Sequence, residues 1–239
     1  MRFLTLARYP TFVEGLDESL EGGIPQGHVV LVQGPSGSMK STLAYSILHH
    51  NVRAGNARGL YVSFEQSRPS ILFQMKSCGF KTEEVGENLA VLDLALIRKS
   101  IGEITGSSWL EVFKMYVKSL REQIGYDLMV LDSITALSVV SKPKEPRVEI
   151  FRLFEWLKEH GFTVLTIAED MPPNIADATM HDEVILADGV IRLDMVPINV
   201  VDVKRRLKIP KMRGVKHNLG YFDFEIKGGK FSATKSIVD

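Results

Sequence analysis

Short apolar runs alternate along most of the chain with longer segments that repeat apolar residues at helical spacing. The apolar runs predict strands at residues 28–33, 59–64, 89–92, 127–132 and 162–167. The segments between them predict helices at about 40–54, 68–78, 108–124 and 146–160. Strands joined by helices of this length are typical of βαβ units, so we expect an α/β fold with a mainly parallel sheet flanked by helices.

The pattern changes after Asp182, where strand-like runs follow one another closely at residues 190–193, 203–209 and 221–226. Because only turn-like residues separate these runs, we expect an antiparallel C-terminal extension of the sheet. The chain contains no fixed-period repeat and no long Pro/Gly/Ser linker. The sequence therefore predicts a single domain over residues 1–239.

Composition narrows the class of protein. Of the 239 residues, 45% are hydrophobic and 24% are charged, as in ordinary globular proteins. The 29 Lys and Arg residues balance 29 Asp and Glu residues, which argues against a general nucleic-acid or membrane-surface binder. No apolar run approaches the ~18 residues that cross a bilayer, and Arg8 interrupts the N-terminal apolar residues, so we expect a cytoplasmic protein.

A candidate phosphate-binding loop directly follows the predicted strand at 28–33. A polyphosphate needs inward-facing N–H groups, a helix N-terminus, a lysine and a hydroxyl for magnesium. Gly34, Gly37, Lys40 and Ser41 supply these parts. The predicted nucleotide-binding residues are Gly34, Pro35, Ser36, Gly37, Ser38, Met39, Lys40, Ser41 and Thr42. The alternative is a tight Gly-Ser turn before a helix.

Met39 departs from the motif G-x-x-x-x-G-K-[ST], because it occupies the position of the second glycine. A residue that opens a helix can have a negative, helical φ, and we expect this at Met39. If Met39 has such a φ, the loop binds a polyphosphate only where the Met39 side chain does not crowd the phosphates.

Two carboxylates are expected at the same edge of the sheet as this loop. Asp132 ends the apolar run at 127–132, and ligands of open α/β sheets bind at this carboxyl edge. Asp132 and Ser41 are therefore the predicted magnesium ligands, directly or through water. Glu65 follows the run at 59–64 and is the predicted base for an attacking water. Each carboxylate could instead cap a helix or turn.

A basic segment near the C-terminus contains Lys211 and Arg213, which point the same way if the segment is a strand. Two adjacent cations suit a phosphate or the nucleotide of another subunit. Without an oligomer, a solvated edge strand protected by its charge is the simpler interpretation.

Together, these segments resemble the KaiC-type ATPases of the RecA superfamily over roughly residues 12–228. The matching segments are residues 15–18, 22–27, the phosphate-binding loop, 64–65, 131–133 and 211–214 with His217. The chain is similar to one KaiC domain and to archaeal one-domain relatives, whereas the clock protein carries two such domains. The resemblance implies a RecA-like P-loop NTPase core.

The resemblance also implies ATP and Mg²⁺ bound between subunits of a ring, typically a hexamer, with hydrolysis that changes affinity for a protein partner. It assigns the base to Glu65, and Lys211 and Arg213 to the neighbouring subunit's γ-phosphate. Gln66 stands where the clock proteins usually have a second Glu, and Met39 replaces a Gly. Residues 182–187 contain no Ser or Thr, which disfavours the autophosphorylation of the clock branch.

Two other functions stay open at this stage. The first is a nucleotide-sensing scaffold without turnover, which Met39 and Gln66 would permit. The second is a DNA-repair accessory ATPase that binds single-stranded DNA through loops at residues 141–147 and 169–183. The first loop is mildly basic, but the second carries five acidic residues and no Lys or Arg, which repels DNA.

Overall fold

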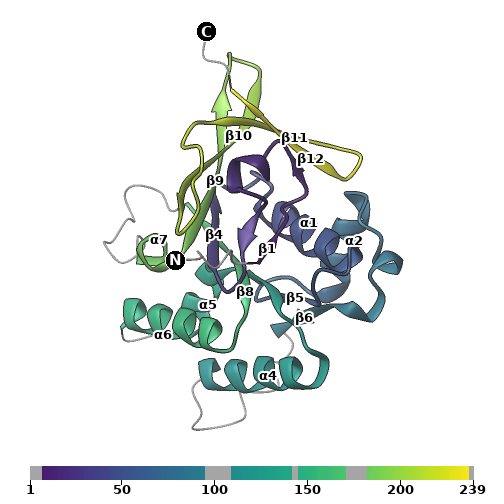
Figure 1. Cartoon of the computed structure of the whole chain (residues 1–239), viewed down its shortest axis with the longest axis vertical. Helices are drawn as coiled ribbons and strands as arrows, with labels where there is room; N and C mark the ends of the chain where they lie inside the picture. Colours follow the sequence, from purple (N-terminus) through teal and green to yellow (C-terminus); the bar gives the residue numbers. More distant parts are fainter. Residues whose placement is uncertain (1–6, 95–108, 142–144, 171–181, 237–239) are drawn as a thin grey trace, which may run out of the picture.

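A ten-stranded sheet with helices on both of its faces forms the centre of the molecule (Figure 1). The computed structural model describes residues 7–94, 109–141, 145–170 and 182–236. The strand order is β2-β12-β11-β10-β9-β4-β8-β7-β5-β6. A separate two-stranded sheet pairs β1 (Arg8–Tyr9) with β3 (Ile24–Pro25).

The middle of the large sheet is parallel, as the sequence predicted. All five predicted strands are present, as β4 (Val29–Gly34), β5 (Gly59–Ser63), β6 (Leu89–Asp93), β7 (Leu128–Asp132) and β8 (Thr163–Glu169). They pair in parallel with one another, and β9 (Gly189–Pro197) also lies parallel to β4. The prediction of a mainly parallel core is confirmed.

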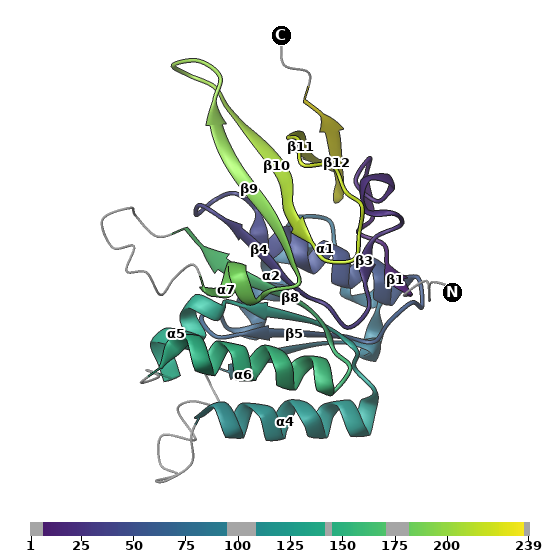
Figure 2. The same cartoon turned by 60° about the vertical axis from the view of Figure 1, so that its left-hand side comes forward.

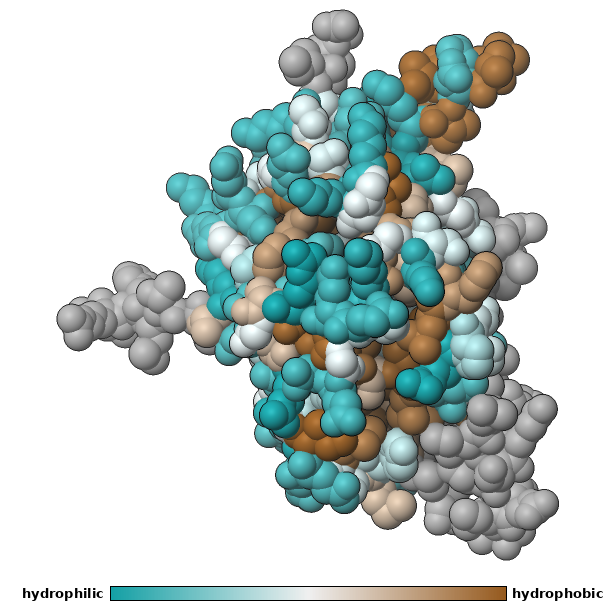
Figure 3. Space-filling view, turned by 90° about the vertical axis from the view of Figure 1, so that its right-hand side faces the viewer, coloured by the Kyte–Doolittle hydropathy of each residue, from teal (hydrophilic) through white to brown (hydrophobic). Residues whose placement is uncertain are grey.

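The antiparallel extension is confirmed and is longer than predicted. Strands β10 (Val203–Met212), β11 (Phe222–Lys227) and β12 (Lys230–Lys235) continue antiparallel from β9, and β2 (Val13–Glu14) closes this side. The β9–β10 hairpin projects from the body (Figure 2), and hydrophobic residues gather at a projecting tip in the space-filling view (Figure 3). Ile198, Val200 and Val201, between the two strands, are exposed. The sequence prediction missed β12, the two-residue strands and α7 (Asp182–Leu186), which precedes the first expected run at residues 190–193.

Two layers of helices cover the sheet. α1 (Lys40–Arg53) and α2 (Arg68–Ser77) lie on one face, and α4 (Trp109–Ile124), α5 (Ile134–Ser141) and α6 (Pro146–Glu159) on the other (Figure 2). The four predicted helices are confirmed, whereas α5 was not predicted. Only Ser133 separates its eight residues from β7, so the apolar residues of the strand and of the helix follow one another closely in the sequence.

Both faces of the central strands are buried, which explains why their sequences are apolar without alternation. In β4, Val30 and Val32 belong to the core under α1, whereas Val29 and Leu31 belong to the core under α6. All four side chains are at most 1% exposed. The sheet is therefore fixed from both sides, and its carboxyl edge is held rigidly.

Four loops leave this carboxyl edge next to one another. They follow β4, β5, β7 and β8; Asp132 is the last residue of β7, and Glu65 lies two residues after the end of β5. Among the described residues, no helix is long and apolar enough to cross a membrane. The loops proposed for DNA contact lie largely outside the described residues, at 142–144 and 171–181.

Close packing of α1 on the sheet requires a glycine at position 59. A Cβ atom on Gly59 would lie 2.7 Å from Val52 Cγ2 and 2.8 Å from Leu48 Cδ1. We predict that Gly59→Ala lowers the free energy of unfolding by about 1–3 kcal/mol in urea titrations, because the stiff Val52 cannot move aside. In the double variant with Val52→Ala the loss should be smaller than the sum of the two single losses. Additive losses would contradict this account of the packing.

Candidate functional site

The loop between β4 and α1 needs glycine at two positions for different reasons. A Cβ atom on Gly34 would lie 2.2 Å from the carbonyl oxygen of Leu193 and 3.0 Å from Ser38 Oγ, so no side chain fits there. Gly37 has a φ of 81°, in the left-handed region that favours glycine. These two residues let the backbone turn tightly from the strand to the N-terminus of α1.

Met39 also adopts a left-handed conformation, with a φ of 76°. The expected negative φ was therefore wrong. The reason is positional: Met39 is the N-cap residue, outside the helix that begins at Lys40, and the chain turns into the helix there. A left-handed conformation costs a residue with a side chain roughly 1–2 kcal/mol. The partly buried Met39 side chain packs against the core under α1.

Lys40 is the cation of the loop and is only 6% exposed. Its Nζ donates a hydrogen bond to the carbonyl oxygen of Pro35 at 3.0 Å. Burial lowers the pKa of Lys40, and the charges of Glu169, Asp170 and Asp132 act against that shift. A positive group held among acidic residues in this way is suited to bind phosphate oxygens.

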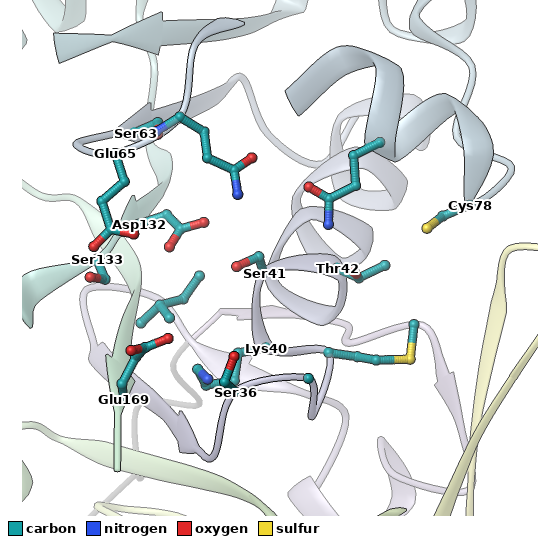
Figure 4. Close-up of a pocket in the computed structure, with 15 residues that line it drawn as sticks. Ser36, Lys40, Ser41, Thr42, Ser63, Glu65, Cys78, Asp132, Ser133 and Glu169 are labelled. Atoms are coloured by element: carbon teal, nitrogen blue, oxygen red, sulfur yellow. The ribbon is translucent and has the colours of Figure 1, made fainter. Parts of the chain in front are cut away.

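Asp132 ends β7 and faces the first turn of α1 (Figure 4). Tyr61 donates a hydrogen bond to Asp132 Oδ2. Burial raises the pKa of Asp132, while hydrogen bonds from Tyr61 and Ser41 and the charge of Lys40 lower it. The predicted magnesium ligands, Asp132 and Ser41, are therefore side by side.

Glu65 lies beside Asp132 and forms a hydrogen bond with Ser133 (Figure 4). Burial raises the pKa of Glu65, and the negative charges of Asp132 and Glu169 add to the increase. A carboxylate with a raised pKa holds a proton more readily than an exposed one, which is the property expected of a general base.

These groups line one cavity of about 400 Å³. Of the predicted residues, it is lined by Ser36, Gly37, Met39, Lys40, Ser41, Thr42, Glu65 and Asp132. Gly34, Pro35 and Ser38 are not part of the lining, and the buried Ser38 hydroxyl has no hydrogen-bond partner among the described residues. Gln66 also lines the cavity.

Sequence reasoning missed several lining residues, including Glu169, Ser133, Gln74 and Cys78. Glu169 ends β8 and could have been found by the argument used for Asp132, because both end parallel strands. Gln74 and Cys78 lie in and just after α2, and no motif marks them.

Lys211 and Arg213 lie away from this cavity, near α7. Lys211 Nζ donates to the carbonyl oxygens of Val184 at 3.0 Å and Ile185 at 2.8 Å. Arg213 Nη1 pairs with Asp188 Oδ1 at 2.8 Å. Burial, followed by repulsion from Arg213, lowers the pKa of Lys211. Arg213 lies just after the end of β10, and both cations donate to the carbonyl oxygen of Ile185. The structure does not bring them to their own chain's pocket.

The donor set fits a magnesium nucleotide. A carboxylate and a hydroxyl are the oxygen ligands that Mg²⁺ takes, and the first N–H groups of α1 have no partner within the helix. Among the described residues, the buried Ser38 hydroxyl has no hydrogen-bond partner, and the buried Lys40 ammonium donates to the carbonyl oxygen of Pro35.

The KaiC ATPase family model matches residues 9–233. The circadian clock protein KaiC2 of Synechocystis sp. is 30% identical over 226 residues, covering 94% of this chain and 39% of that protein. The circadian clock oscillator protein KaiC of Thermostichus vulcanus is 30% identical over 233 residues, covering 93% and 43%. The chain thus spans about two fifths of the length of these relatives.

The fold is also similar to that of a KaiC-like protein of known crystal structure. The KaiC-like protein of the hyperthermophilic archaeon Pyrococcus horikoshii OT3 matches with a TM-score of 0.81 at 25% sequence identity. The match covers 95% of this chain and 99% of that chain. The prediction of a RecA-like core with an antiparallel extension is confirmed.

The left-handed backbone at position 39 can be tested with two variants that both lack the Met side chain. Because only glycine relieves the strain, we predict that Met39→Gly is more stable to urea than Met39→Ala by about 1 kcal/mol. Calorimetric titration should show ATP affinity equal to or tighter than the parent's in the Gly variant, with Lys40→Ala as the reference for weakened binding. Equal stability of the two variants, or weak binding by Met39→Gly, would refute this account.

The raised pKa of Asp132 predicts a stability effect with a definite sign. Because burial disfavours the ionised form, the destabilisation is absent below the ordinary carboxyl pKa and fully present above the raised one. Asp132→Asn should therefore raise the free energy of unfolding of the nucleotide-free protein near neutral pH, and the gain should shrink as the pH falls toward about 4. With Mg-ATP the order should reverse. A variant less stable than the parent without nucleotide would contradict this.

Proposed function

This chain belongs to the KaiC family of ATPases, and from that premise we propose that it binds Mg-ATP in the described pocket and hydrolyses it to ADP and phosphate. The observation that carries the proposal is the meeting of Lys40, Ser41, Glu65 and Asp132 in one cavity at the carboxyl edge of the sheet. These residues come from three separate segments of the chain. A Gly-Ser turn before a helix would not require the two carboxylates to lie opposite the loop.

Each side chain has a chemical role in this proposal. The glycines and the N-terminus of α1 hold the phosphates, and Lys40 contributes a positive charge that is already partly desolvated. Ser41 and Asp132 hold magnesium, which neutralises charge on the phosphate oxygens. Glu65 orients the attacking water and accepts its proton.

Lys211 and Arg213 are proposed to serve the nucleotide of a neighbouring copy. They lie outside their own chain's pocket and share one surface, with the Arg213 side chain 52% exposed. A cation supplied by another subunit stabilises charge on the transferred phosphoryl group and can contribute ~10³-fold or more to the rate. This role requires a closed head-to-tail assembly, and we propose a ring, with a hexamer as the first candidate.

We further propose that residues 1–239 act as one ATPase domain in the cytoplasm and regulate a protein partner according to the bound nucleotide. The relatives named above are circadian clock proteins, but this chain spans about two fifths of their length. A function in timing is therefore not carried over with the ATPase domain.

A nucleotide-sensing scaffold is the second candidate, and two observations favour it. Met39 holds a left-handed conformation that a glycine would adopt without strain. Gln66 lines the pocket with a neutral amide and cannot act as a base. In such a protein ATP binding alone would change the assembly.

The base can be identified by comparing two pocket carboxylates. We predict that Glu65→Gln lowers the rate of phosphate release by about 10²-fold or more while ATP affinity stays close to the parent's, because a general base acts only in the chemical step. Glu169→Gln, a matched change at the same edge, should keep measurable turnover. The reverse result would assign the base to Glu169.

Phosphate release by the parent protein also tests the pH dependence of turnover and the two alternative functions. Because the pKa of Glu65 is raised, kcat/KM for the parent should fall on the acid side at a higher pH than for an ordinary glutamate. No turnover in the parent would favour the scaffold. Turnover that rises with single-stranded DNA would favour the repair ATPase.

A further inference from the structure

We propose that Asp188 is a positioning residue that orients Arg213 toward the nucleotide of the neighbouring subunit. This inference rests on the proposed function, in which Arg213 acts in trans. Asp188 directly precedes β9 and lies beside Val29, at the start of β4. The pocket lies at the other end of β4, so Asp188 does not act through its own chain's nucleotide contacts.

The Asp188 carboxylate joins Arg213 to the central sheet. Asp188 is 8% exposed, and its Oδ1 accepts a hydrogen bond from Arg213 Nη1 at 2.8 Å. Its Oδ2 accepts from the backbone N–H of Val29 at 3.1 Å. The two oxygens therefore have different partners, and the orientation of the carboxylate is fixed by the strand that leads to the phosphate-binding loop.

Backbone contacts hold the same three residues together. The N–H of Asp188 donates to the carbonyl oxygen of Val29 at 2.8 Å, and the N–H of Arg213 donates to the carbonyl oxygen of Asp188 at 2.8 Å. His28 Nε2 lies 3.0 Å from the carbonyl oxygen of Arg213. The main chain on both sides of the ion pair is thus immobilised, which leaves the guanidinium as the part whose direction the carboxylate sets.

Among the described residues, Arg213 has partners for only part of its guanidinium. A guanidinium has five N–H donors, and the bonds to Asp188 and to the carbonyl oxygen of Ile185, at 3.3 Å, use two of them. Its side chain is 52% exposed although one edge is anchored. A charge-assisted pair with a buried carboxylate reduces the rotamers that such a long side chain must lose on reaching a phosphate.

A second cation near Asp188 provides a matched control. Lys158 Nζ lies 3.9 Å from Asp188 Oδ2 and 2.6 Å from Glu155 Oε1. Lys158→Met removes a positive charge from the same carboxylate without removing the acceptor of Arg213. If only the balance of charge around Asp188 matters, Lys158→Met and a substitution of Asp188 should both change turnover. If the orientation of Arg213 matters, only the substitution of Asp188 should change it.

The first test measures steady-state phosphate release by Asp188→Asn. Val29 and Arg213 donate to different oxygens of Asp188, so one of these two donors would face the NH₂ group of the amide and lose its acceptor. We expect kcat to fall roughly 10- to 100-fold, the scale seen when a group that orients a functional residue is lost. KM for ATP should stay within about threefold of the parent's, because an interaction made only in the transition state changes kcat and leaves ground-state binding intact.

The control variant, Lys158→Met, should keep the parent's kcat. Parent-like or increased kcat in a folded Asp188→Asn protein would overturn the proposal.

The second test mixes variants that each have reduced turnover. Asp188→Asn mixed with Glu65→Gln should turn over faster than either variant alone, because one type of interface then combines an intact Glu65 with a correctly oriented Arg213. Asp188→Asn mixed with Arg213→Ala should show no such gain, since both defects affect the same side of the interface. Recovery in the second mixture, or none in the first, would overturn the proposal. If Asp188→Asn fails to fold, Asp188→Glu replaces it in both tests, since it keeps the charge but displaces the guanidinium.

Failure of this inference can be told apart from failure of the proposed function. If Arg213→Ala keeps the parent's turnover, the trans role itself is wrong. If Arg213→Ala loses turnover and Asp188→Asn keeps it, only the role of Asp188 is wrong.

Discussion

The parallel register of β4, β5, β7 and β8 is the constraint on which the rest of the structure depends. Ser63 is the register partner of Asp132, and Gly34 is the register partner of Glu169. Neighbouring strands lie about 4.8 Å apart, so the residues that end these strands must meet at one edge. Both faces of the strands are packed against helices, which prevents a slip of register that would separate them. The site is therefore a consequence of how the core is buried.

At the same edge of the sheet, the pocket contains more negative than positive side chains, and a bound cation would reduce this imbalance. Among the described residues lining the cavity, Lys40 is the one cation, whereas Asp132, Glu65 and Glu169 are acidic. Burial raises the pKa of both Asp132 and Glu65, so their ionised forms are costly in the empty fold. A bound divalent cation would offset that cost. The cost of the ionised carboxylates in the empty pocket and the magnesium-nucleotide binding that we propose thus share one physical origin.

The central strands and the phosphate-binding loop could be predicted from the sequence, because local patterns specify them. The central strands are short apolar runs with clear ends, and the loop that contains Lys40 lies between one of them and a helix. The backbone of Met39 could not be predicted, since its φ depends on where the helix begins. The places of Glu169 and Gln74 depend on strand order and helix packing, which the sequence does not state. The ion pair between Asp188 and Arg213 joins residues 25 positions apart and has no sequence signature.

The proposed function places the pocket and the acting Arg213 on different copies of the chain. The pocket brings Lys40, Ser41, Glu65 and Asp132 together, while the exposed Arg213 lies at the opposite end of the sheet. Under that proposal, turnover is a property of the assembly. The most direct measurement is size-exclusion chromatography with light scattering, with and without Mg-ATP, and phosphate release measured across the same fractions. The account predicts turnover only in a nucleotide-stabilised ring, whereas full turnover in monomer fractions would contradict it.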